Sequence, residues 1–330
     1  MGTLAHGRAT TAVCSSVAAI SLLTACGNVT GQPNSEPTPS NGPISFSRFD
    51  STASHVFVMD PAGGPATKLT SGPGVQAHSA WSPDGTQVAY SQINDTDASI
   101  MRVDSTGTGT VLLHKAAWSI VPSWSPGGQR IAFTSDSDGN FEIYSMAADG
   151  SDVKQIAFTD PPTMHVGPKY SPDGSQLLYA FKSAADAEKP IQDLWIMNTD
   201  GSSPKQLTFG YDNTESRTWS PDGHRIAFNS ITNGVGQIFV MNADGTGIQQ
   251  LTQDPAATPT FAPGGIFPGL RGSVTPAWSP DGRSIAYASN REGNYEVYTM
   301  DPDGTNVVRI TDSPAEELSV GWSPDPRGES

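Results

Sequence analysis

The chain has 330 residues with a formal net charge of −15, and it is rich in glycine (34) and proline (27). Hydrophobic residues make up 36% and charged residues only 15%, a balance that is typical of short strands joined by tight turns and unlike that of a helical bundle. The negative charge repels a phosphate backbone, so we expect neither DNA nor RNA as a partner.

The N-terminal segment, residues 1–25, has the layout of an export signal. An uncharged stretch of small and apolar residues follows Arg8, and it is too short and too weakly apolar for a stable membrane span. Cys26 then completes the sequence Leu-Thr-Ala-Cys, which resembles the lipobox of bacterial lipoproteins. The resemblance implies that residues 1–25 are a cleaved lipoprotein signal and that the Cys26 thiol is acylated. In the alternative, an ordinary signal is cleaved and Cys26 is incidental.

Residues 26–43 contain Pro, Ser, Gly and Asn and almost no apolar side chain that could be buried. Such a composition predicts a flexible tether. We therefore expect an exported protein that is held on the extracytoplasmic side of the cell membrane or cell envelope by its lipid alone. Cys14 lies within the expected signal, so the mature chain would have no disulfide.

A five-residue signature recurs through the rest of the chain. It reads Trp-Ser-Pro-Asp-Gly or a close variant, and its six copies begin at Trp81, Trp124, Tyr170, Trp219, Trp278 and Trp322. The spacings of 43, 46, 49, 59 and 44 residues are close to the length of one four-stranded propeller blade. In the turn, Pro fixes φ, Asp can bond neighbouring amides and Gly accepts positive φ. The leading aromatic is large enough to wedge between adjacent blades.

Each repeat is predicted to contain four short strands. The first carries the signature, and apolar segments such as residues 131–133 and 143–146 provide the second and third. An Asp-Gly turn then leads to a last segment such as residues 206–208. Short apolar segments separated by turn residues at this spacing indicate antiparallel strands.

The two ends of this region complement each other. Three segments between residues 44 and 70 match the second, third and fourth strands of a repeat, whereas residues 318–325 supply a first strand with none after it. A sheet made from both ends would close the ring without a free edge. The sequence therefore predicts an all-β, six-bladed β-propeller over residues 44–325, closed by one C-terminal strand that joins three N-terminal strands. A tail, residues 326–330, follows it.

This order of motifs resembles the repeat of TolB-type propellers, which are related to WD40-like proteins, and the resemblance covers residues 44–325. It implies a protein- or peptide-binding scaffold in the cell envelope rather than an enzyme. We expect a monomer without a cofactor, with an envelope protein or peptide as its partner.

Candidate ligand-binding residues lie just before each signature, where the chain leads into the innermost strands. There the repeat gives way to large polar or charged groups, several of which could converge on one mouth of the central channel. The candidates are Gln76, His78, Trp118, His165, Glu215, Arg217, Arg271, Glu316 and Glu317. Such a mixture could hold a peptide tail or a small anionic ligand, or the residues could form solvated loops without a ligand.

No metal site is predicted. His78 and His165 come from different repeats and have no fixed third ligand. Residues 136–142 lack the third acidic position of an EF-hand loop, and residues 290–296 occupy the same place in another repeat, which favours a hairpin turn. The longest spacing comes from a Pro- and Gly-rich insertion, residues 252–275, which could bind a partner or pack on itself.

An enzymatic propeller is the alternative function. TolB-like propellers resemble the non-catalytic domain of prolyl oligopeptidases and the propeller of oligogalacturonate lyases. The sequence has no G-x-S-x-G nucleophile elbow and only five residues after Asp325, which argues against a peptidase. A lyase that acts on an envelope or extracellular polysaccharide would need a cluster of metal-binding His. At most two of the five His in the expected mature chain fall at the expected mouth.

Overall fold

The structure is a computed structural model that describes residues 41–49, 53–161, 163–182, 192–211, 216–255 and 271–324. These residues belong to one compact unit, Pro37–Ser330, and their strands are β1 to β24. Within these ranges, no helix is long and apolar enough to cross a membrane. The predicted signal, Cys26, most of the tether, Glu215, part of the insertion and the tail all lie outside the described residues.

Four of the sheets contain four strands each, and the strands of each sheet are consecutive in the chain. The first sheet consists of β8 (Ser119–Trp124), β9 (Arg130–Ser135), β10 (Glu142–Ala147) and β11 (Lys154–Gln155). The second consists of β12 (Met164–Tyr170), β13 (Gln176–Lys182), β14 (Asp193–Asn198) and β15 (Lys205–Gln206). The third consists of β16 (Arg217–Trp219), β17 (Arg225–Thr232), β18 (Val235–Asn242) and β19 (Gln249–Gln250). The fourth consists of β20 (Ser273–Trp278), β21 (Ile285–Ser289), β22 (Glu296–Met300) and β23 (Val308–Arg309).

The other strands form one sheet of eight strands. They are β1 (Asn41–Phe49), β2 (Ser54–Met59), β3 (Thr67–Lys68), β4 (Val75–Trp81), β5 (Gln87–Ile93), β6 (Ala98–Asp104), β7 (Val111–Ala116) and β24 (Glu316–Pro324). A single parallel pair, Ser54 with Val75, joins β2 to β4. The other neighbouring pairs are antiparallel. β24 pairs with β1, so strands from both ends of the described chain share one sheet, as the sequence predicts.

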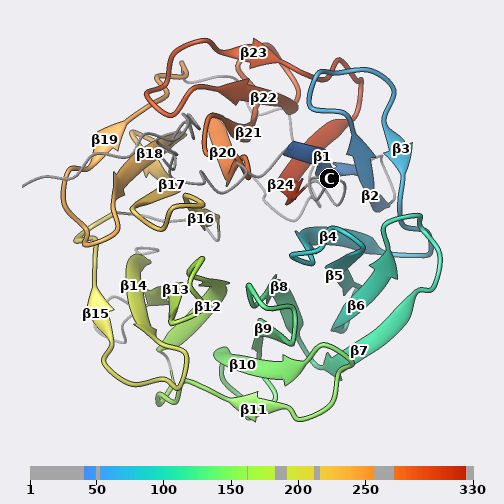
Figure 1. Ribbon diagram of the computed structural model, residues 1–330, viewed down its shortest axis with the longest axis vertical. Coiled ribbons are helices and arrows are strands. Elements are labelled where there is room, and N and C mark those ends of the chain that lie inside the picture. The colour runs from blue at the N-terminus through green and yellow to red at the C-terminus, as the bar shows by residue number, and fades with distance from the viewer. Residues whose placement is uncertain are drawn as a thin grey trace, which may run out of the picture. The chain divides into compact units, whose positions relative to one another are not determined.

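The innermost strands follow one another around a ring (Figure 1). β4, β8, β12, β16 and β20 each contact the next in this order, and β24 contacts both β20 and β4. The short strands β11, β15, β19 and β23 lie at the periphery in the same view. The fold is therefore an all-β propeller with four-stranded blades, which confirms the predicted fold class at this level.

Apolar side chains pack between neighbouring sheets. One buried cluster combines Ile100 of β6 with Trp124 of β8 and Phe133 of β9. The indole N–H of Trp124 donates a hydrogen bond of 3.1 Å to the backbone oxygen of Ala80 in the neighbouring sheet. The signature aromatic is thus wedged between two sheets, as predicted, and both its ring and its polar N–H are accommodated there.

The signature turn is held by its own side chains, as the turn that begins at Ser171 illustrates. The Ser171 hydroxyl donates to Asp173 Oδ1 at 2.6 Å, and the backbone N–H of Ser175 donates to the same oxygen at 3.0 Å. These hydrogen bonds, first of all that from Ser171, lower the pKa of the Asp173 carboxyl. Gly174 has φ of 73°, and a Cβ at this position would lie 3.5 Å from Pro126 of the preceding turn. The turn therefore depends on glycine for its positive φ, whereas a Cβ here would make only an ordinary van der Waals contact with Pro126.

Candidate ligand-binding channel

The innermost strands share a β-bulge just before the signature. In five of them two residues oppose a single residue of the neighbouring strand, and the register shifts there. The first residue of each bulge lies three positions before the signature aromatic and has a left-handed backbone. These residues are His78 (φ 55°), Val121 (55°), Gly167 (64°), Thr275 (50°) and Ser319 (55°).

Only one of the five bulges has glycine at its left-handed position, Gly167. A side chain in this conformation costs about 1–2 kcal/mol, because Cβ approaches the following carbonyl oxygen, and the β-branched Val121 and Thr275 are the least expected there. The bulge also interrupts the alternation of side chains along the strand. As a result, the side chains of His78, Val121, Thr275 and Ser319 face a common cavity.

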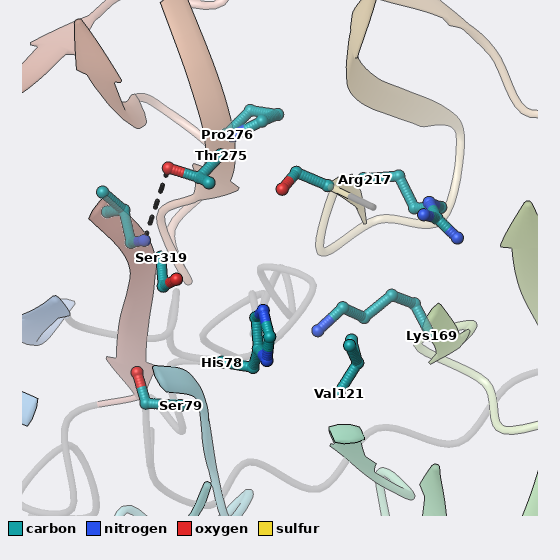
Figure 2. A pocket seen from close by; sticks show the side chains of 10 residues that line it. His78, Ser79, Val121, Lys169, Arg217, Thr275, Pro276 and Ser319 are labelled. Atoms are coloured by element: carbon teal, nitrogen blue, oxygen red, sulfur yellow. Dashed lines mark hydrogen bonds between the residues drawn. The ribbon is translucent and has the colours of Figure 1, made fainter. Parts of the chain in front are cut away.

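This cavity lies among the six innermost strands and has a volume of about 50 Å³. Figure 2 shows how its side chains approach from different strands around the ring. It is lined by His78, Ser79, Val121, Lys169, Ser216, Arg217, Thr275, Pro276, Ser319 and Val320. None of these lining residues is acidic, although the whole chain has a net charge of −15.

Two cationic side chains, Lys169 and Arg217, bring positive charge to the described lining of the cavity. Lys169 of β12 points its ammonium group across the cavity toward His78 (Figure 2). Its burial and the positive charge of Arg217 lower its pKa to about 8. Arg217 of β16 is 1% exposed, and its Nη1 donates to the backbone oxygens of Val166 and Gly167 at 2.7 and 2.9 Å. Lys169 is therefore protonated in most molecules at neutral pH, although the site does not favour a positive charge.

His78 is neutral at the same pH. Its burial and the positive charge of Lys169 lower its pKa to about 4. Its Nδ1 lies 3.2 Å from the hydroxyl oxygen of Ser91 on β5. His78 is thus an uncharged polar group at neutral pH, and Lys169 and Arg217 supply the positive charge.

A second, wider cavity of about 210 Å³ lies beside the signature turns. Its lining is rich in aromatic and proline rings and consists of Trp81, Pro83, Ser123, Trp124, Ser125, Pro126, Lys169, Tyr170, Ser171, Pro172, Thr218 and Trp219. Lys169 lines both cavities. The wider cavity, which we call the turn-side mouth, therefore has a cationic group at its boundary with the inner cavity.

Of the residues expected at the channel, His78 and Arg217 line the inner cavity, whereas three others are buried in contacts with neighbouring strands. Gln76 Oε1 lies 3.0 Å from Nδ1 of His55 on β2. His165 Nδ1 lies 2.6 Å from Oε2 of the fully buried Glu142 on β10. The structure thus gives Gln76 and His165 hydrogen-bond partners inside the protein.

Glu317 is the third of these buried residues. Its side chain is fully buried and forms an ion pair of 2.7 Å with Arg48 of β1. Burial raises the pKa of the Glu317 carboxyl, and the nearby Arg48 limits this rise. This carboxylate links β24 to β1 and does not line the inner cavity.

The remaining candidates that the structure describes, Trp118, Arg271 and Glu316, do not line either of the two cavities. Glu316 Oε2 accepts from the backbone N–H of Tyr295 at 2.6 Å. The backbone N–H of Trp118 donates to Asp136 Oδ1 at 2.7 Å, and the backbone oxygen of Arg271 accepts from Gly236. Glu215 lies outside the described residues.

The predicted hairpin in residues 136–142 is confirmed. It joins β9 to β10, and the backbone N–H of Gly139 donates to the oxygen of Asp136 at 2.8 Å. Asp138 Oδ2 accepts from Gln155 at 2.6 Å. Among the described residues, no group of three or more His, Cys, Asp or Glu is arranged to hold a metal ion.

Sequence reasoning missed Lys169, which precedes the signature at Tyr170 by one position. A signal was available, because Lys169 is the only charged residue directly before any of the six signature aromatics. The other channel positions had no such signal, since Val121, Thr275 and Ser319 are small or apolar residues that the repeat pattern does not distinguish.

These features define the protein as a β-propeller with a polar central channel. A family model described as the TolB beta propeller domain matches residues 33–186 and 160–267. The chain therefore belongs to the TolB β-propeller family, which confirms the resemblance found in its sequence.

Solved structures share the fold. TolB from Acinetobacter baumannii has a TM-score of 0.70 and 22% identity, covering 86% of this chain and 67% of that one. The putative TolB from Agrobacterium tumefaciens has a TM-score of 0.63 and 21% identity, covering 87% and 95% of the two chains. An oligogalacturonate lyase in complex with manganese has a TM-score of 0.51 and 14% identity, covering 74% and 73%. At these identities the likeness shows the fold alone.

Three proteins that are similar to this chain in sequence carry different descriptions. An uncharacterized protein of Agrobacterium fabrum, Atu1656, is 29% identical over 198 residues, 57% of this chain and 60% of its own length. A TolB homolog of Chlorobium luteolum is 29% identical over 135 residues, 41% and 27% of the two chains. An uncharacterized peptidase of Bacillus subtilis, YuxL, is 32% identical over 121 residues, 36% and 16%. The match thus spans between 16% and 60% of the length of these relatives.

Proposed function

We propose that this propeller is a binding platform for a protein or peptide of the cell envelope, and that the partner enters the turn-side mouth. The observation that carries the proposal is the lining of this mouth, where Trp and Tyr rings stand beside the exposed rings of Pro83, Pro126 and Pro172. Aromatic rings supply a large contact area with little loss of side-chain entropy. Membership of the TolB β-propeller family supports a role in binding.

We further infer that the eight-stranded sheet represents two blades, because among the described residues a single strand pair, Ser54–Val75, connects the ladders of its two halves. The propeller then has six blades over residues 44–325. In this proposal residues 26–43 are the tether, Cys26 carries the lipid after removal of residues 1–25, and the mature protein is a monomer on the extracytoplasmic side of the membrane.

Fatty-acid labelling tests the anchor. Cells that express the full chain or its Cys26→Ala variant are fed an alkyne fatty acid, and the protein is examined for label and for its partition between membrane and soluble fractions. We expect the wild type to carry the label and to sediment with membranes, and the variant to do neither. A wild type without label would refute lipidation.

Crosslinking in intact cells tests the binding platform, with Pro126→Glu as a variant of the mouth. A negative side chain at this exposed position adds bulk and charge where a partner would lie. Pro204→Glu is the matched control, because Pro204 is exposed and does not line the mouth. We expect Pro126→Glu, but not Pro204→Glu, to lose the envelope proteins that crosslink to the wild type. Equal recovery by all three proteins would refute binding at the mouth.

A second candidate function is proton abstraction from a polysaccharide. One observation favours it: Lys169 has a pKa near 8, which suits a general base. The fold is also shared with an oligogalacturonate lyase. An assay for unsaturated uronate product on acidic polysaccharide, with and without manganese, tests this function, and activity that Lys169→Met abolishes would favour the enzyme over the platform.

A further inference from the structure

Lys169 lies in surroundings that do not balance its charge. Among the described residues that line the inner cavity, Arg217 is the other charged side chain and none is acidic. Lys169 is half-buried, and a cation that is partly removed from water is costly unless an anion is paired with it. The cavity therefore favours a negative charge that the described lining residues do not supply.

Ser319 provides an independent observation. Ser319 is only 7% exposed, and its hydroxyl oxygen is buried without a hydrogen-bond partner among the described groups. Figure 2 shows Ser319 on β24, on the opposite side of His78 from Lys169. Buried hydroxyls normally have a partner, and a molecule bound in the cavity that Ser319 lines would supply one.

The size of the cavity limits what that molecule can be. A cavity needs a volume of roughly 10–15 Å³ to hold one water molecule, and the inner cavity has about 50 Å³. The cavity has room for a small charged group of a few heavy atoms, but not for a sugar chain or a folded segment.

We propose that the inner cavity binds a small oxyanion, a carboxylate or phosphate group, with the Lys169 ammonium as its ionic partner and the Ser319 hydroxyl as a hydrogen-bond donor. The inference rests on the proposed binding function and specifies the chemistry that the channel recognises. Because Lys169 also lines the turn-side mouth, a ligand whose body occupies the mouth can present its charged group to Lys169.

Titration calorimetry with defined probes tests the proposal on the mature protein. The probes are sodium phosphate, sodium acetate, and a short apolar peptide with either a free or an amidated C-terminal carboxyl group, each measured against sodium chloride at equal ionic strength. We expect saturable binding of at least one oxyanion probe. Tighter binding of the free-carboxyl peptide than of acetate and of its amidated form would identify a peptide carboxylate as the preferred group. Tighter binding of phosphate than of either would identify a phosphate group.

Variants connect this binding to the cavity. Lys169→Met keeps an unbranched side chain as far as Cε but removes the charged Nζ, and it should weaken binding about 10- to 100-fold, as expected for the loss of a charge-assisted hydrogen bond. Ser319→Ala should weaken it by about 10-fold or more, because the lost hydrogen bond is to a charged acceptor. Lys68→Met on the exposed strand β3 is the matched control and should bind as the wild type does. Circular dichroism establishes that each variant is folded.

The inference is overturned if no oxyanion probe binds more tightly than chloride, or if Lys169→Met binds the probes as the wild type does. This failure is distinct from failure of the binding platform. Crosslinked partners that disappear with Pro126→Glu would still support the platform in the absence of any oxyanion binding. Conversely, oxyanion binding without crosslinked partners would support the cavity and refute the platform.

Discussion

The channel lowers the pKa values of both His78 and Lys169, so it disfavours the charged form of each side chain. Burial is the larger cause of the lowered pKa in each case. The second cause is a neighbouring cation, which is Lys169 beside His78 and Arg217 beside Lys169. A lowered pKa in the folded protein changes the free energy of unfolding with pH, because the unfolded chain titrates at the ordinary value. Both residues should therefore make stability depend on pH.

His78 should destabilise the protein in mild acid. The unfolded chain binds a proton near pH 6.5, whereas folded His78 remains neutral down to about pH 4, so stability falls as the pH decreases through this window. The expected loss is about 2 kcal/mol between neutral pH and about pH 5. His78→Asn, which tolerates a left-handed backbone, should remove this loss in urea unfolding measured across the window. An unchanged pH profile in the variant would contradict the prediction.

Lys169 should also lower stability at neutral pH. Between about pH 8 and 10.5 the unfolded chain holds the proton that folded Lys169 has released, so wild-type stability rises with pH in this range and carries the full penalty below it. We expect Lys169→Met to increase the free energy of unfolding by about 1–3 kcal/mol at neutral pH, with a smaller gain above pH 8. A loss of stability would mean that the ammonium group has a stabilising partner.

At the scale of the strand, the bulge determines which side chains reach the channel. It places a left-handed residue three positions before the signature and shifts the alternation of side chains across that point. Gly167 has a second role, because its carbonyl accepts from Arg217 and its missing side chain leaves room for the guanidinium group.

Gly167→Ala should therefore destabilise the protein and displace Arg217. The added Cβ would lie 3.0 Å from both Nη atoms of Arg217, on a backbone with φ of 64°. The expected cost is about 1–3 kcal/mol, measured by urea unfolding. Gly234→Ala is a matched control, because Gly234 has φ of 79° and a Cβ there meets nothing within 4 Å. If the two substitutions cost the same, the contact with Arg217 contributes nothing.

The repeat allowed the strand order, the signature turn and the aromatic wedge to be predicted, because each depends on local residue types that recur. The channel could be predicted only in part. Strict alternation places Gln76 and His78 on the same face of the strand, yet His78 lines the cavity and Gln76 binds His55. The difference arises because backbone conformation at the bulge is not encoded by a particular residue type, since His, Val, Gly, Thr and Ser all occupy its first position. Lys169 is distinguished in the sequence by its place directly before a signature aromatic, but its contact with the cavity depends on strands from other sheets.

At the scale of the whole propeller, one sheet joins the two ends of the described chain. β24 is hydrogen-bonded to β1, and the Arg48–Glu317 ion pair of 2.7 Å crosses this pair of strands. Arg48 also lies over the ring of Phe57 on β2, 4.5 Å from its centroid. A fully buried carboxylate, a guanidinium group and an aromatic ring thus reinforce the junction that closes the ring.

Removal of residues 316–330 should open this junction. It deletes β24 and leaves the hydrogen-bonding edge of β1 unpaired, and loss of the fully buried Leu318 alone should cost about 2–5 kcal/mol. We expect a lower midpoint of thermal unfolding and concentration-dependent association through the exposed edge, both detectable by calorimetry and by light scattering after size exclusion. Removal of residues 326–330 is the control and should change neither, since β24 ends at Pro324. If the longer truncation unfolded at the wild-type midpoint and stayed monomeric, β24 would not be what closes the propeller. The oxyanion cavity, which includes Ser319 of the same strand, would then need to be reconsidered.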